Sequence, residues 1–258
     1  MQLQDSDSGR CPSARPIVRA ACYAVIAADV TEQGVFQLNR FEHSRAPLVV
    51  GIGGTTRAAS STERALAVAL GGAQEAGAQT RLFGGAFLHR LPHYAPENDE
   101  RTDEQLELIE AVRHADALVI ATPGYHGGVS GLVKNALDTL EDLRDDARPY
   151  LDGRAAGCIV TAYGWQAAGS VLTSLRSIVH ALRGWPTPFG AGINTLETRF
   201  DSAGLCSDPK VAEQLATVGR QAAQFAIAFG GEAQAGDHGA AGGGPSHAGA
   251  AGIFALAD

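Results

Sequence analysis

Between residues 47 and 230, short apolar runs alternate strictly with longer segments whose apolar residues recur every three or four positions. A short apolar run is typical of a strand buried on both faces, and the longer spacing is typical of an amphipathic helix. The predicted strands are 48–50, 79–83, 118–120, 159–160 and 187–194. The predicted helices are 62–71, 102–115, 131–143, 171–182 and 211–229, the last opened by Asp208 and Pro209. This alternation predicts an α/β fold, a doubly wound five-stranded parallel sheet with helices on both faces.

The two ends of the chain differ in composition from this central region. Residues 230–258 contain nine glycines and nine alanines among 29 residues, so they have few large apolar groups to offset the entropy cost of ordering. We therefore assign 1–46 to an N-terminal extension, 47–230 to a ligand-binding domain, and 231–258 to a Gly/Ala-rich flexible tail.

Two features bear on the cellular compartment. Three arginines precede the apolar stretch 20–28, as in a secretory signal, but Asp5 and Asp7 lie where such a signal should be basic. None of the four cysteines forms a Cys-x-x-Cys pair, and four in a chain of this length do not make a disulfide scaffold. We therefore expect a cytoplasmic protein, and a buried, apolar setting for Cys158.

Charge and hydropathy exclude several classes of partner. The chain has 20 basic and 28 acidic residues, a net charge of -8, which opposes non-specific binding to nucleic acid or anionic lipid. No apolar run approaches the roughly 18 residues that a membrane-spanning helix needs. His89 and His93 are four residues apart, but Pro92 between them breaks a regular helix. We therefore expect a small-molecule substrate, with no nucleic acid, no membrane and no metal site.

The loop after the first predicted strand has the character of an anion site. It lacks the lysine of a P-loop, and Thr56 stands at the third glycine of the dinucleotide fingerprint. What remains is a run of hydroxyl side chains with one arginine at the start of a helix. Free N–H groups there attract anions, and Arg57 adds a forked charged donor. A terminal phosphate fits this loop; the alternative is that its hydroxyls only cap the helix.

The loop after the third predicted strand resembles the NADPH-dependent FMN reductase family of flavodoxin-like flavoproteins. Pro123 and Tyr125 match that family's Pro-x-Tyr loop, and the residues 133–138, Val-Lys-Asn-Ala-Leu-Asp, match its following helix. The first loop also fits the family's Gly-Ser-x-Arg-x-x-Ser pattern, with Thr55 in the Ser position, then Arg57 and Ser60. The resemblance covers about 47–230 and implies a flavodoxin-like, FMN-binding domain there.

The resemblance also implies which residues bind the flavin. The implied phosphate contacts are Thr55, Arg57, Ser60 and Thr62. The implied ring contacts are Pro123, Gly124, Tyr125, His126, Gly127, Tyr163, Gly164 and Trp165. Gly124 and His126 depart from the Glu and Asn that are common in the family, and His126 could instead be an exposed loop residue. Trp165 could instead pack at a subunit interface.

The activity implied is hydride transfer from NADPH or NADH to N5 of FMN, followed by electron transfer to an acceptor or release of reduced flavin to a partner monooxygenase. Since the cofactor carries the chemistry, we assign no catalytic residue. The resemblance further implies a homodimer or homotetramer. A quinone, azo or metal-ion reductase on the same fold, a flavodoxin-like electron carrier, and a binding domain that has lost flavin remain alternatives.

Overall fold

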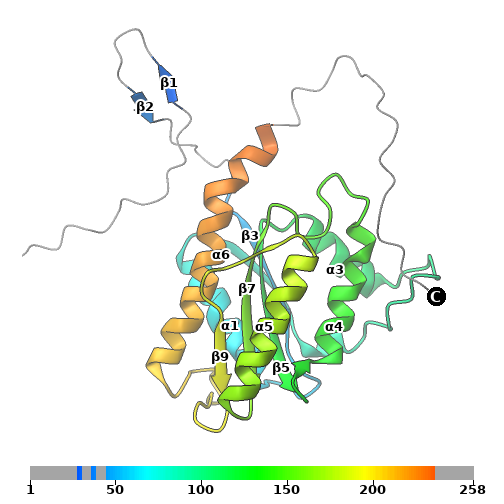
Figure 1. The fold of residues 1–258 in the computed structure, drawn as a ribbon, viewed down its shortest axis with the longest axis vertical. Helices are drawn as coiled ribbons and strands as arrows, with labels where there is room; N and C mark the ends of the chain where they lie inside the picture. Colours follow the sequence, from blue (N-terminus) through cyan, green and yellow to red (C-terminus); the bar gives the residue numbers. More distant parts are fainter. Residues whose placement is uncertain (1–27, 31–35, 39–44, 236–258) are drawn as a thin grey trace, which may run out of the picture. The chain divides into compact units, whose positions relative to one another are not determined.

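The computed structural model describes residues 28–30, 36–38 and 45–235. The short strands β1 (Ala28–Val30) and β2 (Phe36–Leu38) pair antiparallel and form one unit, and the residues from 45 on form another (Figure 1). Most of the signal-like stretch 20–28 and of the Gly/Ala-rich tail lies outside the described residues.

The second unit is built on five parallel strands in the order β4-β3-β5-β7-β9. Their bounds are β3 Leu48–Gly53, β4 Gln79–Phe83, β5 Ala117–Tyr125, β7 Ala155–Ala162 and β9 Ala191–Asn194. This confirms the predicted doubly wound parallel sheet. Strands β5 and β7 are longer than predicted, because alanine and glycine positions continue the buried runs on both sides of their most apolar residues.

Two further strands of two residues each raise the total in this sheet to seven, against the five that we predicted. Strand β6 (Gly128–Val129) folds back antiparallel on the end of β5, and β8 (Trp185–Pro186) pairs with the start of β7. The predicted strand 187–194 is therefore wrong over 187–190, where the chain leaves the ladder. Strands β8 and β9 both pair with β7. Pro188 lies between them and has no N–H to donate, so the pairing with β7 is interrupted there.

Helices cover both faces of the sheet, as predicted. The long helices α1 (Ser61–Glu75) and α6 (Pro209–Ala235) pack on one face. The other face carries α3 (Asp103–Arg113), α4 (Gly131–Asp138) and α5 (Trp165–Ala181). Two short helices, α2 (Gly85–Leu88) and the 3₁₀ helix η1 (Thr139–Leu143), complete the set.

Several predicted helix ends change in the structure, and α5 begins at Trp165, well before the predicted start at 171. The predicted helix 131–143 tightens to a 3₁₀ turn at Thr139, whose hydroxyl donates to the Asn135 carbonyl at 2.9 Å, a local competitor for helical bonding. Helix α6 begins after Asp208, whose carboxylate accepts from the Lys210 N–H at 2.9 Å. It continues to Ala235, so 231–235 are helical although we assigned them to the tail.

Cys158 lies on β7, fully buried between the sheet and α5, as expected. Burial raises the pKa of its thiol to about 12, so the thiol stays protonated and unreactive at neutral pH. Within the described residues, no helix is both long and apolar enough to cross a membrane.

Candidate functional site

A cavity of about 670 Å³ opens at the carboxyl ends of the parallel strands, the end toward which the β9 arrow points in Figure 1. It is lined by the loops after β3, β7 and β9 and by the last residues of β5 and β7. Ligands of doubly wound folds bind at this edge, where the strand order reverses between β3 and β5.

The loop after β3 presents a helix N-terminus to this cavity. Ser60 caps α1, with its Oγ accepting from the Glu63 N–H at 3.3 Å. Ser61 and Thr62 follow in the first turn, and within the described residues their backbone N–H groups have no protein acceptor. These two N–H groups are therefore available to an anion.

The same loop is held rigidly from outside the cavity. Glu63 reaches away from its own helix, and its carboxylate accepts from the Gly85 N–H at 2.9 Å. A Cβ at Gly85 would lie 1.8 Å from the Thr55 carbonyl oxygen, so only glycine lets α2 approach this closely. Thr55 in turn accepts through its hydroxyl from the Arg57 N–H at 3.2 Å. The loop is thus organised before any ligand arrives.

Thr62 joins α1 to the sheet. Its hydroxyl lies 2.6 Å from the hydroxyl of Thr161, near the end of β7, and both residues are buried. The hydroxyl therefore already has a protein partner, and the N–H of Thr62 is the group left free on this residue.

The lining is cationic in an acidic protein. Arg57, Arg64 and Arg199 all line the cavity, and its lining contains no aspartate or glutamate. Arg64 donates to the Phe200 carbonyl at 2.7 Å. Within the described residues, the guanidinium groups of Arg57 and Arg199 have no acceptor. This arrangement favours an anionic ligand.

The predicted ring residues divide between two hollows. Pro123, Gly124 and Tyr125 line the main cavity, as does Tyr163, and both tyrosines are exposed. The residues Gly127, Gly164 and Trp165 instead line a neighbouring hollow of about 410 Å³, which shares Tyr163 with the main cavity. The indole of Trp165 is not free, since its Nε1 donates to Glu197 at 3.0 Å.

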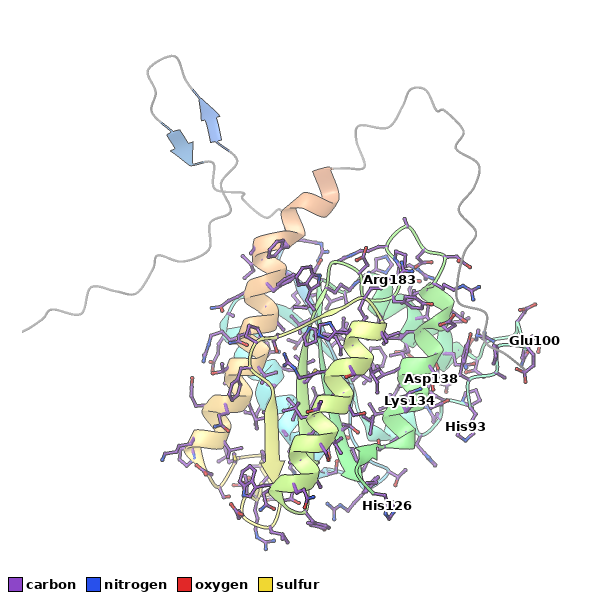
Figure 2. The ribbon with its side chains drawn as sticks, in the orientation of Figure 1. His93, Glu100, His126, Lys134, Asp138 and Arg183 are labelled. Atoms are coloured by element: carbon purple, nitrogen blue, oxygen red, sulfur yellow. The ribbon has the colours of Figure 1, made fainter. Side chains whose placement is uncertain are left out.

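His126 lines neither hollow. It sits with a φ of +52° in the turn between β5 and β6, exposed at the end of the molecule (Figure 2). The structure thus gathers eight of the predicted residues in the main cavity and three beside it, and leaves His126 outside.

Sequence reasoning missed the loop after β9. The residues of this loop that line the cavity are Thr195, Leu196, Thr198, Arg199 and Phe200. Other lining residues outside the prediction are Ala59, Ser61, Arg64, Thr161 and Ala162. The signal was present, because hydroxyls and an arginine directly follow the last predicted strand. The rule that drew attention to the loops after the first, third and fourth strands applies equally to the fifth.

A protein-family model described as NADPH-dependent FMN reductase matches residues 47–194, more than half of the chain. The chain belongs to this family. The match runs from the start of β3 to the end of β9, and it includes the lining residues that follow β3 and those around the ends of β5 and β7; the lining loop after β9 lies beyond it.

Curated relatives of this FMN reductase family member include the FMN-dependent NADPH-azoreductase of Staphylococcus aureus. The two are 36% identical over 94 residues, which are 36% of this chain and 46% of the relative. The match therefore spans about half the length of that relative.

Solved structures share the fold. The flavoenzyme NAD(P)H:(acceptor) oxidoreductase FerB from Paracoccus denitrificans superposes with a TM-score of 0.60 at 21% identity, over 71% of this chain and 99% of FerB. The apo NADH:FMN oxidoreductase EMOB superposes with a TM-score of 0.52 at 21% identity, over 71% and 90% of the two chains.

The family motif on α4 lies away from both hollows. Lys134 pairs with Asp138 at 2.6 Å on the outer side of the helix (Figure 2). Asn135 holds the chain before α3, accepting from the Tyr94 N–H and donating to the Pro92 carbonyl, both at 2.9 Å. These residues brace the fold, whereas the Pro-x-Tyr loop before them lines the cavity.

Proposed function

We propose that this protein is an NAD(P)H-dependent FMN reductase that binds FMN in the cavity at the carboxyl ends of the strands. The observation that carries the proposal is the charge of that cavity, in which three arginines and a free helix N-terminus meet no carboxylate. These residues fit a phosphate, and the cavity also offers exposed tyrosines to a flat ring.

In this proposal each loop has its own role. The loop after β3 holds the phosphate with the N–H groups of Ser61 and Thr62, the capping Ser60, and Arg57 with the Thr55 turn. The end of β5 and the loop after β7 hold the ring, with Pro123, Gly124, Tyr125 and Tyr163 facing it. Bound FMN supplies the redox chemistry, accepting hydride from NADPH or NADH and passing electrons to an acceptor.

The hollow beside Tyr163 leaves the ring side open. Its lining residues at the turn after β5 and at the start of α5 are small or exposed. An open ring side suits alternation of nicotinamide and acceptor over one flavin face. In this proposal the chain positions the flavin ring and the nicotinamide ring, and no protein side chain lies between the two.

The acceptor and the assembly are also proposals. Release of reduced flavin to a partner monooxygenase is one route. Direct reduction of an azo, quinone or metal-ion acceptor is the second, and the azoreductase name of the Staphylococcus aureus relatives supports an azo acceptor. We further propose a cytoplasmic homodimer or homotetramer; the free thiols Cys158 and Cys206 suit a reducing compartment.

The test is an absorbance spectrum of the purified protein, followed by NADPH or NADH addition with and without free FMN. A yellow protein that consumes NAD(P)H supports the bound-flavin reductase. Turnover only with added FMN supports the flavin supplier. A yellow protein that NAD(P)H leaves oxidised indicates an electron carrier, and a protein that neither binds FMN nor oxidises NAD(P)H overturns the proposal.

A further inference from the structure

One buried amide lies between two of the loops that line the candidate cavity. Asn194, the last residue of β9, is 4% exposed and stands in register with Ala162 at the end of β7. Its Oδ1 accepts from the Gly164 N–H at 3.0 Å and from the Leu196 N–H at 3.2 Å. A single side chain therefore joins the loop after β7 to the loop after β9.

The amide nitrogen of Asn194 binds the carboxylate of Glu197. Asn194 Nδ2 donates to Glu197 Oε1 at 2.6 Å, and the Trp165 indole donates to the same oxygen at 3.0 Å. Glu197 lines neither hollow. Two donors thus hold this negative charge outside a lining that contains arginines and no carboxylate.

Gly164 needs an external partner. It precedes α5 with a φ of +99°, in the left-handed region that favours glycine, and it offers no side chain to cap the helix. It also stands between the exposed aromatic residues Tyr163 and Trp165. The bond from its N–H to Asn194 therefore fixes the backbone that carries both rings.

We propose that Asn194 is a positioning residue of the flavin site, a role that rests on the proposed function. It does not line the cavity itself. It acts through Gly164, which sets the aromatic edge formed by Tyr163 and Trp165, and through Glu197, whose carboxylate it keeps away from the bound anion.

The polarity of the amide provides the test. N194D keeps an oxygen for the N–H groups of Gly164 and Leu196 but replaces the donor to Glu197 with a second carboxylate oxygen. Two carboxylates at this distance repel each other, so Glu197 leaves Trp165 and negative charge reaches the rim of the cavity. We expect FMN to bind about ten-fold more weakly.

The double variant N194D/E197Q restores the connection with reversed polarity. The amide nitrogen at position 197 donates to the carboxylate at position 194, so the two groups no longer repel each other and no extra negative charge reaches the rim of the cavity. We expect the Kd for FMN to return to within about two-fold of the wild-type value.

Two measurements report on each variant. FMN fluorescence titration gives the Kd, and the fluorescence anisotropy of Trp165 without flavin gives the mobility of the aromatic edge. The chain has two tryptophans, so W185F as the parent of all variants leaves Trp165 as the reporter. N194D should lower the anisotropy of Trp165.

N135D is the matched control. Asn135 also uses both ends of its amide, to hold one backbone segment at Pro92 and Tyr94, but it lines neither hollow. Its substitution should leave the Kd for FMN and the anisotropy of Trp165 unchanged.

The outcomes separate the two proposals. A wild-type protein that binds no FMN overturns the proposed function together with the flavin role of Asn194. A wild-type protein that binds FMN while N194D binds it equally well overturns the positioning role alone. Weaker binding in N194D without recovery in N194D/E197Q also overturns it, because the loss would then not depend on the Glu197 contact.

Discussion

Two hollows of nearly equal volume differ in how their arginines are used. The candidate cavity measures about 670 Å³, and a groove between α3 and η1 measures about 650 Å³. In this α3–η1 groove, Arg101 forms two hydrogen bonds with Asp142, Arg113 pairs with Asp146, and Arg144 lies between Glu141 and Asp145. In the candidate cavity, Arg57 and Arg199 have no acceptor within the described residues and no acid in the lining.

The volume of a hollow therefore does not distinguish a binding site from a structural groove in this protein. The pairing of the charged side chains that line the hollow does. The guanidinium of Arg101 also lies 5.1 Å from the Tyr94 ring centre, and its hydrogen bonds to Asp142 raise its pKa above the ordinary value. Such a satisfied cation holds the chain before α3 against η1. Cations left without acceptors repel one another and gain most from an incoming anion.

The largest effect on flavin binding is expected for the double variant R57A/R199A. We expect the Kd for FMN to rise about a hundred-fold, because each arginine contributes a charge-assisted contact with about ten-fold effect. The melting temperature should not fall, since neither guanidinium has a protein partner to lose. Fluorescence titration and thermal unfolding measure the two quantities. A lowered melting temperature with unchanged Kd would show that these arginines brace the fold instead.

Arg101→Ala tests the opposite case. Its loss leaves Asp142 without its bidentate partner and Tyr94 without its stacked cation, so the free energy of unfolding should fall by about 2 kcal/mol. The Kd for FMN should stay the same. Urea unfolding measures the stability, and the exposed pair of Arg81 with Glu107 provides the control, since R81A should change it by less than about 0.5 kcal/mol. An equal effect of both variants would contradict the bracing role.

Two neighbouring serines of the candidate cavity, Ser60 and Ser61, differ in whether their hydroxyl caps the helix. Ser60→Ala removes the acceptor for the Glu63 N–H and should cost about 1 kcal/mol of stability. S61A is the matched control, because the neighbouring hydroxyl has no hydrogen bond within the described residues. Both residues line the cavity, so weaker FMN binding in both variants with lower stability only in S60A separates binding from capping. Equal stability losses would refute the assigned cap.

The smallest effect is expected at Arg144. It is exposed and pairs with neighbours on its own chain segment, Glu141 and Asp145. Since exposed ion pairs are screened by solvent, R144A should change neither the Kd for FMN nor the melting temperature measurably. A clear loss of flavin binding in this variant would place the α3–η1 groove, and not the candidate cavity, near the flavin.

The sequence was sufficient for the layered fold and for the capped start of α1, because both depend on patterns among near neighbours. The apolar periodicities predicted strands and helices, and the hydroxyl residues at 60–62 predicted a cap, which the structure places at Ser60. The start of the last strand was wrong, because the pairing with β7 is interrupted at Pro188, which has no N–H to donate.

Contacts between distant residues required the folded chain. Thr62 and Thr161 are 99 positions apart, yet their hydroxyls lie 2.6 Å from each other and join the first loop to β7. No periodicity predicts that His126 lies outside the lining or that Arg199 lies within it. Nor does any predict that Glu197 is held out of the lining by Asn194 and Trp165. Side-chain direction at a loop depends on the packing of neighbouring elements, which becomes definite only when the sheet brings the ends of its strands together.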